Sequence, residues 1–223
     1  MASLPTRIEV YEDGIVDFFR WRTGLDYYMT IDRIVDFVVD TGGKKVLDLL
    51  ADTAVFALNL AGRKAFRGHI YSFDTNITLL ERAKQRAAQL NLDDTVEFRP
   101  FQEKNIPVAS GYGDVAVSIF DFHRHPPEQY LAEILRVLVP NGHLILAEMV
   151  ESKASKNPWV SIWKKLQMKY LKKNEAEAEA VYYDQEEIIT MLFEAGFRQV
   201  IVQGLNVPTS TYSGVFCLIT ATK

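Results

Sequence analysis

Three side chains that can move a proton stand close together in the middle of the chain. Asp121, His123 and His125 lie within the sequence DFHRHPP. Histidine titrates near physiological pH and can take a proton from a substrate hydroxyl, so His123 is a candidate general base, with Asp121 as a second candidate. The same run is also typical of a polar loop. The histidine pair has no third ligand nearby, so no metal site is predicted.

Two further carboxylates, Asp48 and Asp74, close the apolar runs KVLD and HIYSFD. A carboxylate at the carboxyl end of a strand can accept hydrogen bonds from both hydroxyls of a ribose, which makes Asp74 a candidate nucleoside ligand. Each acid also has a structural alternative. Asp74 precedes Thr75 and Asn76 and could cap the next helix, while Asp48 could brace a loop.

The stretch from Val46 to Ala61, VLDLLADTAVFALNLA, has the outline of a strand, a loop and a helix. A ligand-binding loop of this kind normally contains glycine, because the backbone must bend with positive φ and the ligand must lie against it. Here the loop positions 50–54 are filled by Leu, Ala, Asp, Thr and Ala. The sequence therefore predicts a ligand-binding outline with an altered loop.

The composition favours one globular domain over residues 1–223, with 48% hydrophobic and 24% charged residues. A net charge of -4 gives no overall attraction to nucleic acid. The sequence lacks a signal-peptide core and any apolar run of about 18 residues. With Cys217 as its single cysteine, the chain is expected to be an untargeted cytoplasmic protein whose cysteine is buried in a strand.

From Lys44 onward, short β-branched runs alternate with helical patterns, which indicates a parallel sheet covered by helices. The expected strands are Lys45–Leu49, His69–Phe73, Thr95–Phe98, Val115–Ile119, His143–Glu148, Gln199–Leu205 and Val215–Thr222. The expected helices are Ala54–Gly62, Ile77–Leu90, Glu128–Leu138 and Asp184–Ala195. Asn141-Gly142 is expected to form a turn directly before the fifth strand. The last two strands are expected to form an antiparallel hairpin.

Two aromatic segments lie outside this core and are candidates for shaping a substrate pocket. The first, Tyr11–Asp40, contains Trp21, Tyr27 and Tyr28, which could line the pocket or pack as an N-terminal cap. In the second, Pro158–Val181, Trp159 and Trp163 recur at helical spacing, and seven lysines between Lys153 and Lys173 accompany them. That helix could be a lid, a dimer face or a helix at a membrane surface.

In this order, the pieces resemble the class I S-adenosylmethionine-dependent methyltransferases, in particular the UbiE-like quinone methyltransferases. The resemblance is carried by VLDL, SFDTNITLLERAKQRA, RVLVPNGHL and LFEAGFRQVIV, and it covers roughly residues 44–223. It implies an α/β, Rossmann-like fold with a seven-stranded, mostly parallel sheet, a C-terminal antiparallel hairpin and helices on both faces. Its parts would be a helical cap (1–43), a cofactor-binding core (44–150), a helical lid insertion (151–183) and a last helix with the terminal strand pair (184–223).

The resemblance also assigns the donor contacts in the first half of the core. The family loop reads approximately VLDLGCGTG, so Leu50, Asp52 and Thr53 stand where the methionine part of the donor would lie. Asp48 matches an acid that helps to orient the methionine ammonium group. Asp52 would bring a negative charge near the methionine carboxylate, unless a different loop conformation turns it toward the ammonium.

The contacts to the nucleoside are assigned in the same way. Asp74, followed by Thr75, matches the acid that holds the ribose hydroxyls. Relatives carry an acid after the third strand that accepts a hydrogen bond from the adenine amino group; here Phe101 takes that place and Gln102 follows. Phe101 could stack on the purine or fill an emptied adenine pocket, and the Gln102 carbonyl could accept from the amino group. His123 matches the first histidine of a hydrophobic-His-His sequence in the family.

The resemblance implies methyl transfer from S-adenosylmethionine to an oxygen or carbon of a small, aromatic or quinone-like acceptor. Proximity and orientation would carry the catalysis, with His123 or Asp121 assisting deprotonation. Because the loop glycines and the adenine acid are absent, the alternative is a methyltransferase-fold protein that has lost the donor and binds another ligand or acts as a scaffold. The state of the space above Leu50–Ala54 would discriminate between the two.

Overall fold

A computed structural model describes residues 13–52, 54–101, 105–151, 181–206 and 215–223. Its strands form a seven-stranded sheet in the order β3-β2-β1-β4-β5-β7-β6. They are β1 (Lys45–Asp48), β2 (His69–Asp74), β3 (Val96–Pro100), β4 (Gly113–Ile119), β5 (Leu138–Val150), β6 (Arg198–Gly204) and β7 (Val215–Thr222). Strands β1 to β5 pair in parallel, whereas β7 runs antiparallel to both β5 and β6. This confirms the predicted sheet and its terminal hairpin.

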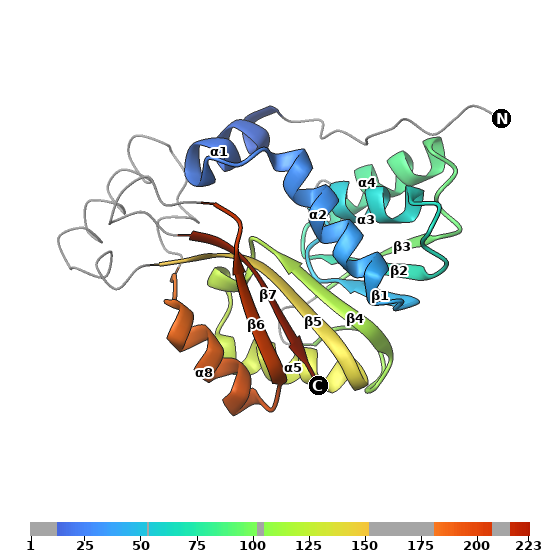
Figure 1. The fold of residues 1–223 in the computed structure, drawn as a ribbon. Helices are drawn as coiled ribbons and strands as arrows, with labels where there is room; N and C mark the ends of the chain where they lie inside the picture. The colour runs from blue at the N-terminus through green and yellow to red at the C-terminus, as the bar shows by residue number, and fades with distance from the viewer. Residues whose placement is uncertain (1–12, 53, 102–104, 152–180, 207–214) are drawn as a thin grey trace.

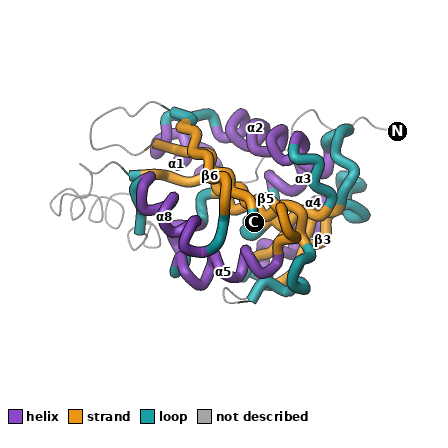
Figure 2. Tube along the Cα trace, turned by 60° about the horizontal axis from the view of Figure 1, so that its bottom comes forward, coloured by secondary structure: helices purple, strands orange, loops and turns teal. Residues whose placement is uncertain are grey.

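Helices cover both faces of the sheet, as Figures 1 and 2 show. They are α1 (Asp13–Thr23), α2 (Tyr27–Asp40), α3 (Val55–Gly62), α4 (Ile77–Gln89), α5 (Pro127–Val137) and α8 (Gln185–Ala195), with a short 3-10 turn, η1 (Phe122–Arg124). One apolar cluster joins α2, α3 and α4 to one face, and a second joins α5 and α8 to the other. Consecutive residues of the interior strand β1 point to opposite faces of the sheet. Val46 lies in the first cluster and Leu47 in the second. Burial on both faces explains why the central strands read as continuous apolar runs.

Side-chain caps fix where several helices begin. Asn76 accepts hydrogen bonds from the amides of Thr78 and Leu79 and so caps α4. Asp184 caps α8 by accepting from the Glu187 amide, and the Glu187 carboxylate accepts from the Asp184 amide in return. The helices that position the site are therefore anchored by local sequence signals.

Strand β5 begins earlier than the sequence predicts. The expected turn at Asn141-Gly142 lies inside the strand range Leu138–Val150, as part of an irregularity opposite the start of β4. Asn141 adopts φ +63°, a left-handed conformation that asparagine tolerates better than most residues. The chain therefore bulges at Asn141-Gly142 and pairs with β4 on both sides, so the strand range begins at Leu138, before the predicted start at His143.

The predicted helix at 158–181 lies outside the described residues, apart from Val181 at its end. Cys217 is buried within β7, as predicted, and burial raises the pKa of its thiol to about 11. Across the described ranges, no helix is both long and apolar enough to cross a membrane.

Candidate active site

The loop between β1 and α3 keeps a glycine-like backbone without glycine. Asp52 adopts φ +41° and Ala54 adopts φ +59°, both in the left-handed region that glycine accepts most readily. These two residues occupy the second and third glycine positions of the family loop. Ala51 and Ala54 are packed into the interior, whereas Leu50 and Asp52 are half-buried. The backbone path has therefore been retained while side chains have been added to it.

Asp74, the predicted ribose ligand, holds this loop in place. One oxygen of its buried carboxylate accepts the Asp52 amide at 2.8 Å, and the other accepts the Asn76 amide at 2.7 Å. The backbone carbonyl of Phe73 accepts the Ala51 amide at 2.6 Å. Asp74 thus joins the end of β2 to the loop after β1, and Asn76 is the residue that caps α4.

Asp48 lies buried at the end of β1. The Ser72 hydroxyl donates to its carboxyl at 2.6 Å, and the Leu50 amide donates to it as well. Burial raises the pKa of Asp48 to about 8 because the charged form loses its hydration, and the nearby carboxylates of Asp74 and Asp52 act in the same direction. Near neutral pH, Asp48 is therefore largely a protonated carboxyl group.

Two of the remaining predicted donor contacts, Phe101 and Thr75, lie within the described residues. Phe101 is buried, and its ring lies 6.3 Å from that of Phe73. Its amide donates to the backbone carbonyl of Asp74 at 3.0 Å. Thr75 is exposed at the end of β2. Thr53 and Gln102 lie outside the described residues.

Two histidine–carboxylate pairs follow the end of β4. The Asp121 carboxylate lies 2.6 Å from Nε2 of His125 and accepts the Tyr130 hydroxyl at 3.3 Å. The Tyr130 ring stacks on the His125 ring at a centroid distance of 4.2 Å. Since the His125 side chain is only 7% exposed and that of Asp121 only 4%, this pair is a buried assembly and not a solvated polar loop.

His123 belongs to a second buried pair. Its Nδ1 lies 2.9 Å from a carboxylate oxygen of Glu148 on β5, and its backbone amide donates to the same oxygen at 3.3 Å. The imidazole stacks on Tyr182 and contacts Phe120 edge to face. The His123 carbonyl accepts the Val181 amide at 3.1 Å. His123 therefore ties the loop after β4 to β5 and to residues 181–182.

Phe120 connects this loop to the N-terminal helices. It adopts φ +53°, a costly conformation for an aromatic residue. Its ring lies 6.5 Å from Phe18, 6.3 Å from Phe19 and 6.1 Å from Phe216. Phe18, Phe19, Phe120 and Phe216 thus form an aromatic wall, with Phe19 and Phe216 buried in the core and Phe120 in contact with His123.

The predicted substrate residues of the first segment lie behind this aromatic wall. Tyr27 packs edge to face on Phe19 and on Tyr28. Trp21 lies 5.8 Å from Phe18 and is 43% exposed. Trp159 and Trp163 lie outside the described residues. The structure therefore joins Trp21 and Tyr27 to the site through one intervening aromatic ring each.

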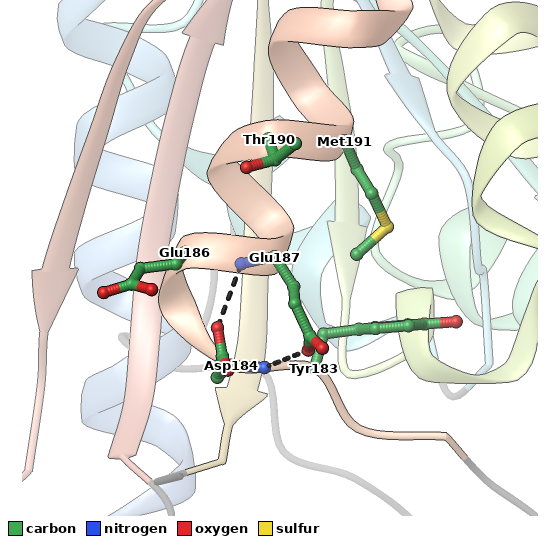
Figure 3. A pocket seen from close by; sticks show the side chains of 6 residues that line it. All are labelled: Tyr183, Asp184, Glu186, Glu187, Thr190 and Met191. Atoms are coloured by element: carbon green, nitrogen blue, oxygen red, sulfur yellow. Dashed lines mark hydrogen bonds between the residues drawn. The ribbon is translucent and has the colours of Figure 1, made fainter.

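A separate open hollow of about 520 Å³ lies at the start of α8 (Figure 3). Its lining residues are Tyr183, Asp184, Glu186, Glu187, Thr190 and Met191. Asp184 and Glu187 form the capping pair of α8, which explains the carboxylates by helix formation. In the described part of the chain, no group of three His, Cys, Asp or Glu side chains is arranged to hold a metal ion.

A match to a protein family shows which family the chain belongs to. A family profile described as methyltransferase domain matches residues 40–196. The chain belongs to the class I S-adenosylmethionine-dependent methyltransferases. It is 28% identical over 176 residues to the ubiquinone/menaquinone biosynthesis C-methyltransferase UbiE of Rickettsia felis. The aligned region covers 72% of this chain and 71% of that protein. It is 25% identical over 191 residues to the demethylmenaquinone methyltransferase of Paenarthrobacter aurescens, covering 78% and 70% respectively.

Solved structures agree on the methyltransferase fold. A SAM-dependent methyltransferase from Aquifex aeolicus superposes with a TM-score of 0.64 at 20% identity, covering 94% of this methyltransferase and 95% of that chain. Since class I methyltransferases bind their donor at the carboxyl ends of β1 and β2, the loop after β1 with Asp48 and Asp74 is the candidate donor site.

Sequence analysis missed three partners in the methyltransferase site. Glu148 pairs with His123 from within the apolar strand run LILAEMV, Ser72 donates to Asp48 from within IYSFD, and Tyr130 donates to Asp121 from α5. A charged or polar residue inside a buried run is a signal that such a partner exists, since unpaired buried charge is costly. The signal does not say which residue the partner is.

Proposed function

We propose that this methyltransferase transfers a methyl group from S-adenosylmethionine to an oxygen or carbon of a small, aromatic or quinone-like acceptor. The observation that carries the proposal is the loop after β1, which holds Asp52 and Ala54 at left-handed φ where relatives have glycine. Adopting this conformation without glycine costs about 1 kcal/mol or more per residue. A loop with no ligand to bind would have little reason to keep it.

The side chains at the candidate donor site are of the types that could bind the parts of S-adenosylmethionine. Two amides donate to the Asp74 carboxylate, which has about four acceptor sites and thus keeps capacity for ribose hydroxyls. Asp48 would face the cationic methionine end, and Leu50 would line the loop there. Phe101 would offer a ring to the purine, with Thr75 at the rim. The other two predicted contacts, Thr53 and Gln102, lie outside the described residues. When bound, the donor supplies a methyl group on a sulfonium centre.

The protein's own residues would orient the acceptor and keep water away from it. The aromatic wall around Phe120 suits a flat apolar ring, and Trp21, Tyr27 and Tyr28 would extend it. Trp159 and Trp163, the other two predicted substrate residues, lie outside the described residues. His123 and Asp121 are the sequence-based candidates for proton transfer, and both lie next to His125 in the loop after β4.

The quinone-like acceptor class is supported by the names of the relatives, which refer to ubiquinone and menaquinone biosynthesis. Their sequence identity to this chain is 25–28%. At this identity we infer only the chemical class of the acceptor from the relatives, and not the compound. A planar ring with a hydroxyl group matches both the aromatic wall and the proton-accepting pairs beside it.

The decisive experiment separates donor binding from methyl transfer. Calorimetry with S-adenosylhomocysteine is expected to detect binding, and mass spectrometry is expected to detect a methylated product from a short-chain 1,4-naphthoquinol. Asp74→Asn removes one charged acceptor of the ribose hydroxyls and is expected to weaken donor binding by roughly tenfold or more.

Asp94→Asn is the matched control, because Asp94 is an exposed acid in the turn between α4 and β3. It is expected to leave donor affinity unchanged. Absence of binding at millimolar S-adenosylhomocysteine would overturn the proposal and leave a protein that binds another ligand or acts as a scaffold. Donor binding without product from any quinol or phenol would overturn only the acceptor class.

A further inference from the structure

His125 has the geometry of a prepared proton acceptor. Asp121 lies 2.6 Å from its Nε2, so a carboxylate faces one ring nitrogen and Nε2 must carry the proton that forms this hydrogen bond. The neutral ring then has an unprotonated Nδ1. In the described residues this Nδ1 is buried and has no hydrogen-bond partner. A buried acceptor without a partner is rare in folded proteins and calls for an explanation.

The surroundings of His125 fix the ring without using Nδ1. Tyr130 stacks on the imidazole with an interplanar angle of 21°. Its hydroxyl donates to Asp121 at 3.3 Å and lies within hydrogen-bond distance, 3.3 Å, of the Ser118 hydroxyl on β4. The charged or titratable groups identified around the ring are therefore Asp121 at the end of β4 and Tyr130 on α5, with Asp48 acting on Tyr130 from β1.

The position in the fold supplies the second argument. β1 lies between β2 and β4, and the strand order reverses between β1 and β4. In open α/β sheets, ligands bind outside the carboxyl ends of the strands at such a reversal. His125 and Asp121 follow the carboxyl end of β4, beside the loop that follows β1. The loop that carries His125 is therefore one of the loops that border the expected reaction site.

We propose that His125 is the residue that takes the proton from the acceptor hydroxyl, with Asp121 as its positioning residue. The O–H bond of the acceptor breaks, the proton moves to Nδ1, and the electron pair stays on the oxygen, from which a conjugated ring shares it with a ring carbon. Asp121 stabilises the resulting imidazolium through Nε2–H. This inference rests on the proposed function and replaces Asp121 as a direct base.

His123 is assigned a different role. One oxygen of Glu148 accepts both its Nδ1–H and its backbone amide, and Phe120 and Tyr182 pack against its ring. Its carbonyl also holds the Val181 amide. These contacts join three chain segments, as expected for a structural brace.

The tautomer of His125 tests the inference without any turnover. Nitrogen-15 NMR of histidine-labelled protein is expected to show His125 protonated at Nε2 only, with His125→Gln used for assignment. Asp121→Asn, which can present an amide N–H to the ring, is expected to shift the proton to Nδ1 or mix the two forms. A wild-type His125 protonated at Nδ1 would overturn the inference, whether or not the protein is active.

The kinetic test uses naphthols and naphthoquinols whose hydroxyl groups differ in acidity. His125→Gln is expected to lower kcat by roughly 100-fold or more for weakly acidic acceptors and by less for acidic ones, with unchanged affinity for S-adenosylhomocysteine. Imidazole in the buffer is expected to rescue His125→Ala in part. A structural defect would lower kcat equally for all acceptors and would not respond to imidazole.

His143→Gln is the control, because His143 lies near the start of β5, away from the carboxyl ends of the strands. Its kcat is expected to match the wild type. Wild-type kcat in folded His125→Gln would overturn the inference, as would a larger and acidity-dependent loss in His123→Gln. If wild-type protein made no methylated product, the proposed function would fail, while the NMR result would still report on the His125–Asp121 pair.

Discussion

At the scale of single residues, the carboxyl groups of the candidate site already form hydrogen bonds within the protein. Asp74 accepts two backbone amides, and Asp48 accepts the Ser72 hydroxyl while its pKa is raised to about 8. Asp121 is engaged with His125 and Tyr130. Each acid is therefore oriented in advance, which is how an enzyme avoids reorganisation when charge develops.

The raised pKa of Asp48 predicts a pH-dependent free energy of unfolding. Between about pH 4 and pH 8, the folded state keeps a proton on Asp48 that the unfolded chain releases, so stability falls as pH rises through this window. The slope from this group is at most about 1.4 kcal/mol per pH unit. Urea unfolding at pH 5 and pH 7.5 is expected to show a smaller pH effect in Asp48→Asn than in the wild type.

Asp94→Asn provides the comparison, since Asp94 is exposed in the turn between α4 and β3 and makes the same charge change away from the site. It is expected to retain the wild-type pH dependence. An equal pH dependence in Asp48→Asn and the wild type would show that Asp48 is ionised in the folded protein at neutral pH.

At the scale of elements, the loop between β1 and α3 combines a left-handed backbone with residues other than glycine. Ala54 adopts φ +59° directly before α3, and its side chain gives that helix no cap. The loop is held instead by hydrogen bonds to Phe73 and Asp74 at the end of β2. Hydrogen bonds to the neighbouring strand β2 thus stabilise the left-handed conformation of the loop.

Ala54→Gly is expected to raise the free energy of unfolding by up to about 1 kcal/mol. Relief of left-handed strain contributes about 1–2 kcal/mol, and the greater freedom of glycine in the unfolded chain offsets roughly 0.5–1 kcal/mol of it. Chemical denaturation measures the difference. Ala51→Gly, a neighbour without positive φ, is expected to destabilise the protein. Equal destabilisation by both changes would contradict the argument.

At the scale of the whole molecule, sheet order brings distant segments to one edge. The ends of β1, β2, β4 and β5 contribute Asp48, Asp74, Asp121 and Glu148, which lie up to 100 positions apart in the sequence. Helix α1 adds Phe18 and Phe19 through Phe120. A ligand at this edge would contact most of the sheet and should stabilise all of it together.

S-adenosylhomocysteine is therefore expected to raise the Tm of the entire protein in a single transition. At a ligand concentration of 100 Kd the gain is about 2.7 kcal/mol, which corresponds to roughly 5–10 °C for a chain of this size. Differential scanning calorimetry measures the shift. Asp74→Asn should show a smaller shift at the same concentration, whereas Asp94→Asn should match the wild type. An unchanged Tm in the wild type would contradict donor binding.

The sequence by itself determined the strands and helices of the core, because burial on two faces produces apolar runs and caps are encoded locally by residues such as Asn76 and Asp184. It also singled out Asp48, Asp74, Asp121 and His123 as candidate site residues, and these lie at or just after the carboxyl ends of β1, β2 and β4. Only the tertiary structure decided their partners. Pairing His125 with Asp121, or His123 with Glu148, depends on contacts across the fold that no local pattern specifies. The positive φ values of Asp52 and Ala54 could not be predicted from the sequence either. Hydrogen bonds to the neighbouring strand hold these residues in a conformation that glycine adopts more readily.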